Sequence, residues 1–438
     1  MKIIELLKKD KRLHGWKVVT YEKNKINLHY TKNFEEENYL EGFRKDVEVT
    51  IYISYGDQIG ENTFPVINDD ENYLKKQIDD AVYACSFTKK QKYELLKKKE
   101  KVPNIKLVDS QISEAIKNGK GHELLKKIAA NLFSEFRKQA NIKLNGMELS
   151  ASKIIFNVLT SKNISVKTEK TELYVDAVIT SFSGKKEQEY LGVEILSRVK
   201  DFDASKFVKK YCNFSQDILK AKSPDSCKGN IILTQDALHE FFFSHINPTP
   251  LILHASARLK HMGISRFNKG DFITINPPQG ETITLISNPH INFNPASSQY
   301  DEDCVASKKI KIIENSRVKN FFGDLRHSQY IGIKPTGLLG VLEVSPGKKP
   351  ESALLKEDHY EIVAFSWFNP NTLSGDFSAE IRLGYIVRNG KKIPFKGGTF
   401  TGNVFHLFRN VYLSKETELV YGYKGPKAIL FKDAQCCC

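Results

Sequence analysis

The stretch Val47-Glu48-Val49-Thr50-Ile51-Tyr52-Ile53 has an alternating pattern that indicates β structure in the first half of the chain. Apolar and polar residues alternate along it, and most of its apolar residues are β-branched. This pattern is typical of a strand with one buried face. Gly56 and Asp57 follow as turn residues, so we expect a hairpin in this part of the chain.

Helices and further strands are predicted in the rest of the first half. Apolar residues at helical spacing indicate amphipathic helices at residues 74–85, 124–136 and 207–218. Alternation indicates strands at residues 173–180 and 189–195, joined by a turn. A half that mixes hairpins with amphipathic helices has an α+β fold.

The composition changes abruptly at residues 220–229, which are rich in Lys, Ser, Pro and Gly. We therefore expect two domains, an α+β domain over residues 1–222 and a β-rich domain over residues 230–438. The second domain should be a sandwich or barrel-like, because it contains many short β-like runs. These runs are residues 230–233, 273–275, 282–286, 309–313, 362–367, 383–387 and 428–431.

The charge of the chain permits two interpretations. Lys and Arg outnumber Asp and Glu by 66 to 52, which gives a net charge of +14 over 438 residues. A clustered positive surface would attract nucleic acid. The basic residues are interleaved with acidic ones through most of the chain, however, and this favours a solvated surface.

The cysteines and the beginning of the chain indicate the compartment. Three of the seven Cys are the last three residues, and the others are far apart, so we expect neither a disulfide framework nor a C-x-x-C metal site. Residues 1–10 are too highly charged for a signal-peptide core, and no apolar run is long enough to span a membrane. The expected location is the cytoplasm, without a membrane partner.

The segment of residues 238–245, Leu-His-Glu-Phe-Phe-Phe-Ser-His, contains the candidate metal ligands His239 and His245 and the candidate catalytic base Glu240. Zinc peptidases of the H-E-x-x-H type place two His on one helix face, with the Glu between them as general base. Here six positions separate the two His, which on a regular helix sets them about 120° apart. A helix break could still bring them together. Histidines packed or hydrogen-bonded beside three Phe are the favoured interpretation, and a metal site is the alternative.

Three adjacent acids, Asp301, Glu302 and Asp303, form a second candidate site. Such a group could bind a hard cation or activate water. Adjacent residues alternate sides in an extended chain, however, so their carboxylates diverge. A solvated loop is the favoured interpretation.

The second half also contains a series of short segments whose order and spacing are more informative than any one of them. They are residues 301–305 (DEDCV), 312–318 (IIENSRV), 332–337 (GIKPTG), 371–378 (NTLSGDFS), 389–391 (NGK) and 402–403 (GN). In this order they resemble the TldD/PmbA family, formerly called modulators of DNA gyrase, and most closely its PmbA (TldE) branch. The strand, turn and helix of residues 47–85 are also similar to that family, so the resemblance covers nearly the whole chain.

The resemblance implies a place in a cytoplasmic peptide-processing assembly in which TldD-type chains carry the zinc. In those metal-bearing chains an H-E-x-x-x-H motif follows a strand, and a Cys ligand precedes the last strand. This sequence has His239 and Glu240 where the motif should begin, but His245 falls one residue late and residues 417–425 contain no Cys. Matching positions therefore do not supply the three protein ligands of an open zinc site.

The sequence also departs from the family at other positions. Gln329 stands where the family usually has Arg, Pro335 replaces a Ser, and an Arg-Gly-Ala run has become Ala379-Glu380-Ile381. The resemblance thus indicates a divergent paralogue, whose peptide substrate need not be the usual one.

One leading hypothesis and two alternatives follow. The leading hypothesis is a PmbA-like subunit with no cofactor of its own, which pairs with a TldD-like zinc peptidase or with a second copy of itself and holds an extended peptide by strand addition. The first alternative is a self-sufficient zinc peptidase that uses His239, Glu240 and His245. The second is a nucleic-acid-binding protein with a Lys-rich surface.

Overall fold

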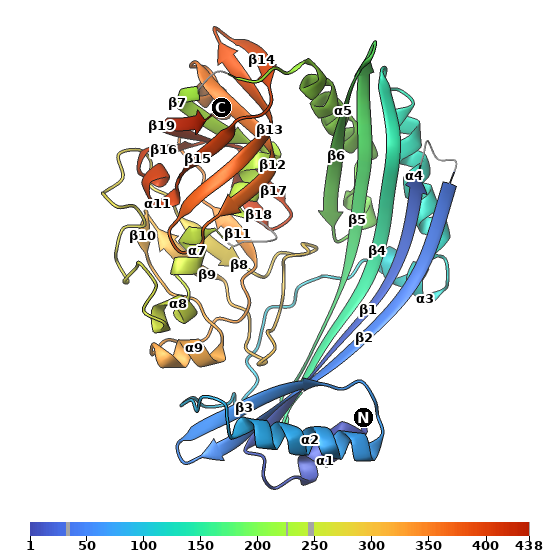
Figure 1. The fold of residues 1–438 in the computed structure, drawn as a ribbon, viewed down its shortest axis with the longest axis vertical. Coiled ribbons are helices and arrows are strands. Elements are labelled where there is room, and N and C mark those ends of the chain that lie inside the picture. Colours follow the sequence, from blue (N-terminus) through green and yellow to red (C-terminus); the bar gives the residue numbers. More distant parts are fainter. Residues whose placement is uncertain (32–35, 225–226, 244–248, 438) are drawn as a thin grey trace.

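The computed structural model describes residues 1–31, 36–224, 227–243 and 249–437. The first half of the chain forms a long antiparallel sheet with helices, and the second half forms a barrel and a smaller sheet (Figure 1). The expected α+β class and the barrel-like second half are confirmed. The boundary between the two expected domains stays a prediction, although α5 ends at Lys220 and β7 begins at Cys227.

The N-terminal sheet contains six antiparallel strands in the order β3-β2-β1-β4-β5-β6. They are β1 (Gly15–Thr31), β2 (Glu36–Tyr55), β3 (Gln58–Pro65), β4 (Ile142–Thr160), β5 (Ser165–Ser183) and β6 (Lys186–Leu196). The stretch at residues 47–53 lies in β2 and pairs with β3, and Gly56 between them has a φ of 68°, which favours glycine. Both predicted hairpins, β2–β3 and β5–β6, are confirmed.

Alternation along β1 decides what covers each face of the sheet. Val18 and Leu28, at even positions, are buried against helices, whereas Val19 packs with Tyr300 of the second half. Successive residues of a strand point to opposite faces, so β1 has helices on one face and loops of the second half on the other. The helices are α1 (Lys2–Lys9), α2 (Glu71–Cys85), α3 (Ser110–Lys117), α4 (Gly121–Phe136) and α5 (Ala204–Lys220). The last of the helices also packs against the second half (Figure 1).

The three helices predicted from apolar spacing are confirmed as α2, α4 and α5. The side chain of Asp70 accepts a hydrogen bond from the Tyr73 N–H at 2.9 Å, and that of Asp203 accepts one from the Lys206 N–H at 3.0 Å. These carboxylates cap α2 and α5 because the first N–H groups of a helix have no partner within it.

The second half closes five strands into a ring in the order β12-β7-β19-β15-β13, since β13 also pairs with β12. They are β7 (Cys227–Thr234), β12 (His359–Pro370), β13 (Asp376–Arg388), β15 (Thr399–Asn403) and β19 (Ala428–Cys437), extended by β14 (Lys391–Phe395) and β16 (Val411–Leu413). Phe241 of helix α6 (Gln235–Phe242) lies in this core, with its ring centre 5.6 Å from those of Phe368 and Phe377 and 5.7 Å from that of Phe431. Aromatic packing thus ties α6 to the barrel.

A second sheet in this half has the order β10-β9-β8-β11-β18-β17. Its strands are β8 (Leu285–Asn288), β9 (Ile310–Glu314), β10 (Arg317–Val318), β11 (Val341–Val344), β17 (Thr417–Val420) and β18 (Tyr423–Pro426). Five short helices complete the described part of this half outside α6 and the 3-10 turns: α7 (Pro250–His254), α8 (Ala257–His261), α9 (Leu325–Tyr330), α10 (Glu351–Leu354) and α11 (Val404–Leu407). Within the described ranges, none of the helices of the chain combines the length and apolar character needed to cross a bilayer.

Six of the seven short strands predicted in this half coincide with or overlap observed strands. They lie in β7, β8, β9, β12, β13 and β19. The strand predicted at residues 273–275 is wrong, because this segment is an irregular loop that buries Ile273 in the barrel-side core. A short apolar run cannot distinguish a strand from a packed loop.

Candidate functional site

Helix α6 places His239 directly after strand β7. The Nε2 atom of His239 lies 2.7 Å from Oε1 of Glu418 in β17, and its ring centre lies 5.4 Å from that of Tyr423 in β18. The His239 side chain is 18% exposed. In this structure His239 is therefore packed and hydrogen-bonded, and its role as a metal ligand stays a prediction.

Glu240 lies on a different side of α6. Burial first, and then the charge of Asp236, raise the pKa of Glu240 to about 7. Asp236 is itself paired with Lys210 of α5 at 2.5 Å, so this side of the helix faces α5. Neighbouring helical residues point about 100° apart, which separates the Glu240 carboxyl from His239. The third predicted residue, His245, lies outside the described residues.

The described residues do not fit the zinc site that the resemblance implies for TldD-type chains. Residues 417–425, where such chains would have a Cys, do lie beside His239, because Glu418 and Tyr423 contact it. At this corner the described residues offer one imidazole nitrogen and one carboxylate, already bound to each other, whereas a catalytic zinc needs three protein ligands. No cluster of three or more His, Cys, Asp and Glu suited to a metal is found in the described part of the chain.

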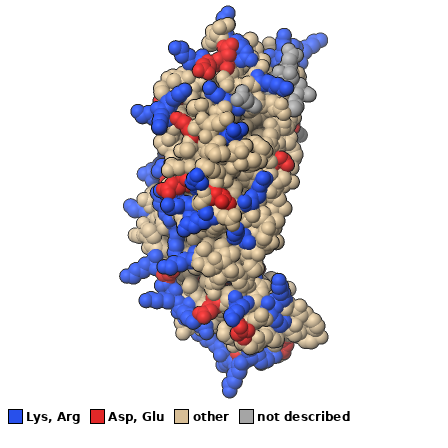
Figure 2. Space-filling view, turned by 90° about the vertical axis from the view of Figure 1, so that its left-hand side faces the viewer, with Lys and Arg blue, Asp and Glu red and all other residues tan. Residues whose placement is uncertain are grey.

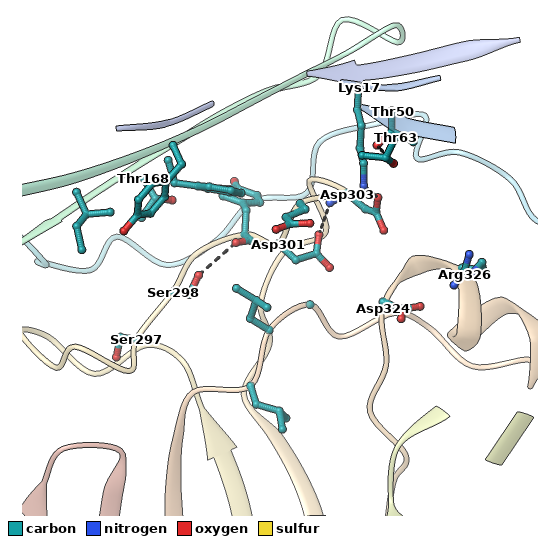
Figure 3. A pocket seen from close by; sticks show the side chains of 18 of the residues that line it. Lys17, Thr50, Thr63, Thr168, Ser297, Ser298, Asp301, Asp303, Asp324 and Arg326 are labelled. Carbon is teal, nitrogen blue, oxygen red and sulfur yellow. Dashed lines mark hydrogen bonds and ion pairs between the residues drawn. The ribbon is translucent and has the colours of Figure 1, made fainter. Parts of the chain in front are cut away.

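A cavity with a volume of about 670 Å³ lies between the N-terminal sheet and loops of the second half (Figure 3). Strand register creates its sheet wall, because residues opposite each other in paired strands share a face. The paired sets are Lys17, Thr50 and Thr63, then Tyr21, Phe156 and Thr168, then Ile154 and Lys170. The facing wall is formed by residues 295–298 and 300–303, Asp324 and Arg326.

Ion pairs cross this cavity at one end. Lys17 of β1 reaches down from the sheet to the loop, and its Nζ lies 2.6 Å from Oδ1 of Asp303. Glu61 of β3 pairs with Arg326 of α9 at 2.5 Å and accepts a hydrogen bond from the Tyr93 hydroxyl at 2.6 Å. These contacts join the first half of the chain to the second.

Asp301 supports the loop that carries Asp303. Its Oδ1 accepts hydrogen bonds from the N–H groups of Asp303 at 2.9 Å and Val305 at 2.8 Å. Burial, and then the charge of Asp303, raise the pKa of Asp301 to about 7. The expectation of a solvated loop is wrong for Asp301, which is only 7% exposed. The sequence shows three adjacent acids but not that Lys17 of β1 contacts one of them, Asp303.

Sequence reasoning missed the main cavity residues, among them Lys17, Tyr93, Lys170 and Arg326. Around Lys170 both faces of β5 carry polar side chains, with Thr168 and Lys170 on one face and Lys167 and Glu169 on the other. Alternation gives no signal in such a strand. The pairing of β5 with β4, and of β4 with β1, shows that Lys170 lies on the cavity face of the sheet.

Basic residues do not gather into one patch on the face shown in Figure 2. Lys and Arg are spread from one end of this face to the other, with Asp and Glu between them. Elsewhere in the described part of the chain, too, basic residues are ion-paired, as Lys45 is with Glu22 at 2.9 Å. This arrangement gives no continuous track for a nucleic-acid backbone on this face.

Comparison with known proteins connects this geometry with a family. Residues 228–436 match the model of the PmbA/TldA metallopeptidase C-terminal domain, so the barrel half is a domain of a metallopeptidase-related class. The second half of the chain is thus similar to the TldD/PmbA family, and the resemblance seen in the sequence is confirmed.

Two curated relatives match part of the chain. An uncharacterised protein of Methanocaldococcus jannaschii is 25% identical over 265 residues, which cover 58% of this chain and 60% of the relative. A zinc metalloprotease TldD homolog of Saccharolobus solfataricus is 24% identical over 229 residues, which cover 47% of this chain and 48% of the relative. The matches therefore span between about half and 60% of the length of these relatives.

Solved structures share the fold over the whole chain. A candidate modulator of DNA gyrase from Thermotoga maritima superposes with a TM-score of 0.82 at 15% identity, covering 99% of this chain and 98% of that one. TldE from Thermococcus kodakarensis superposes with a TM-score of 0.78 at 17% identity, covering 100% of each chain. At these identities the similarity establishes the architecture.

Proposed function

We propose that this chain is a PmbA/TldE-like subunit that acts beside a TldD-type metallopeptidase and holds extended peptide, without supplying zinc itself. The observation that carries the proposal is the corner between α6, β17 and β18. There, His239 is bound to Glu418 at 2.7 Å and lies against Tyr423, in the place where the metal-bearing chains of the family are expected to assemble ligands.

The cavity supports the peptide-holding part of the proposal. Strand β3 forms one edge of the N-terminal sheet, where Ile59 is bridged to Gln91, and farther along contributes Glu61 and Thr63 to the cavity lining. The main-chain groups of an edge strand can pair with an added extended chain, which gives affinity with little dependence on sequence. An edge strand at the border of a polar cavity suits a protein that handles unfolded peptide.

The test compares the purified chain, a TldD-like chain and the two together. We expect the chain alone to contain no stoichiometric zinc by elemental analysis and to leave an unfolded casein-type peptide intact. We expect the two chains to copurify and the mixture to cleave that peptide, with His239→Ala in this chain leaving the rate unchanged. Failure of the chains to associate would overturn the proposal.

The alternative of a self-sufficient zinc peptidase makes the opposite predictions. In that case the chain alone would bind zinc and cleave peptide, His239→Ala would remove the metal, and Glu240→Gln would remove the activity while the metal stayed bound. Unchanged zinc content in His239→Ala rejects this alternative.

A further inference from the structure

The two ends of the cavity differ in whether their basic side chains are paired with a carboxylate. At one end Lys17 is paired with Asp303, and Arg326 with Glu61. At the other end Lys170 of β5 donates one hydrogen bond from Nζ to the carbonyl oxygen of Pro295 at 3.2 Å. In the described part of the chain, no carboxylate lies within 4.0 Å of this ammonium. An ammonium has three donors, so Lys170 retains capacity for an anionic partner.

The surroundings of Lys170 make an unpaired cation there costly. Burial lowers the pKa of Lys170, and Lys23 lowers it as well, whereas Glu172 acts in the opposite direction. Strand register explains the effect of Lys23, because Lys23 and Lys170 both lie opposite Ile154 and therefore share a face of the sheet. A ligand carboxylate beside Lys170 would relieve the cost of burying this charge.

The rest of the cavity restricts the kind of anion. Ile154 and Phe156 of β4 give an apolar lining beside the lysine, and Leu339 also lines the cavity. Glu302 and Asp324 also line the cavity and would repel a ligand with several negative charges. The lining therefore suits a ligand with one carboxylate, an apolar group next to it and an uncharged or cationic remainder. The end of a peptide has this chemistry.

We propose that the Lys170 end of this cavity binds the C-terminal carboxylate of a peptide, with the last side chain of that peptide against Ile154 and Phe156. The inference rests on the proposed peptide-holding function and names the part of the peptide that the cavity recognises. The peptide then runs toward the end of the cavity at which Lys17 and Asp303 are paired.

The test measures the binding of fluorescein-labelled unstructured peptides to the full chain by fluorescence anisotropy. Three probes of roughly ten residues share one Ala-, Ser- and Val-rich sequence. The first has a free C-terminal carboxylate, the second is amidated, and the third is amidated with an internal Glu. We expect amidation to weaken binding roughly tenfold, with no recovery from the internal Glu.

Variants assign the effect to the lysine. Lys170→Met should weaken binding of the free-carboxylate probe to the level of the amidated probe, which itself should bind as before. Lys170→Arg should retain the preference because it keeps the charge. Lys167→Met is the matched control, since Lys167 lies on the opposite face of β5 and pairs with Glu169. It makes the same change in net charge and should leave binding unaltered.

The outcomes separate this inference from the function on which it rests. Equal binding of the free and amidated probes by the unmodified chain, or full recovery through the internal Glu, would overturn the C-terminal assignment and leave peptide holding intact. The comparison in the unmodified chain needs no variant to fold. Absence of binding by all three probes would overturn the peptide-holding function as well.

Discussion

Lys17 in the first strand and Asp303 in a loop of the second half form an ion pair with Nζ 2.6 Å from Oδ1, although 286 positions separate them. The two side chains are only 15% and 26% exposed. Burial lowers the pKa of Lys17, but Tyr52 and Asp303 together raise it above its ordinary value. Lys17 therefore stays charged at neutral pH, and the pair joins the long sheet to the loops that face it.

Removing this pair should loosen the contact between the two halves. We expect Lys17→Met to lower the free energy of unfolding by about 2 kcal/mol, because a largely buried hydrogen bond between charged groups is lost. Urea denaturation measures the change. Lys92→Met is the control, since the Lys92–Asp57 pair is 73% and 70% exposed and should contribute far less. Equal effects of the two variants would contradict the prediction.

Asp301 should make the stability of the protein depend on pH. Its pKa is raised to about 7 by burial and by Asp303, so the folded state keeps a proton that the unfolded chain has released. This carboxyl group therefore lowers the free energy of unfolding as the pH rises from the ordinary Asp range to about 7. Asp301→Asn cannot ionise and still presents an oxygen to the Val305 N–H.

The measurement is denaturant unfolding of both proteins at about pH 5 and about pH 8. We expect the stability of Asp301→Asn relative to the parent to improve between the lower and the higher pH. Asp57→Asn is the control, because the Lys92 partner lowers the pKa of Asp57, and its effect should not change across this range. A pH-independent difference for Asp301→Asn would show that Asp301 is already ionised in the folded state.

Gly192 allows helix α5 to pack closely on strand β6. A Cβ at this position would lie 2.5 Å from Cδ2 of Tyr211, a distance that requires the ring or the strand to move. We expect Gly192→Ala to cost about 1–3 kcal/mol of stability through overpacking, measured by thermal denaturation. Gly42→Ala in β2 is the control, because a Cβ there would meet nothing within 4 Å. A fully stable Gly192→Ala would mean that α5 can shift without loss.

Thr168 carries a buried hydroxyl whose Oγ1 has no hydrogen-bond partner in the described part of the structure. Replacing it by Val removes this polar group and keeps a β-branched shape, so we expect a gain of about 1 kcal/mol. Thr180→Val in the same strand is the matched control. The Thr180 hydroxyl accepts a hydrogen bond from Asn145 Nδ2 at 2.7 Å, so that variant should lose stability. Thermal unfolding of both variants shows whether each substitution raises or lowers the stability.

The strands and helices predicted from the sequence are those that depend on interactions between residues close together in the chain. The alternation at residues 47–53 and the capping acid Asp203 act over a few neighbouring positions, and β2 and α5 formed as expected. The same reasoning identified six of the thirteen described strands of the second half. It missed β1 and β4, because long strands such as Gly15–Thr31 carry polar residues on both faces where they line a cavity rather than a core.

By itself, the sequence determined the fold class, the barrel-like second half, the resemblance to the TldD/PmbA family and the interruption of its metal motif after His239. Only the tertiary structure decided that His239 binds Glu418, that Asp301 is buried, and that Lys17 and Lys170 line one cavity. The physical reason is the separation along the chain of the residues that interact. Periodicity and caps are set by near neighbours in the chain, whereas the pairing of β1 with β4 and the contact of Lys17 with Asp303 join residues far apart in the chain.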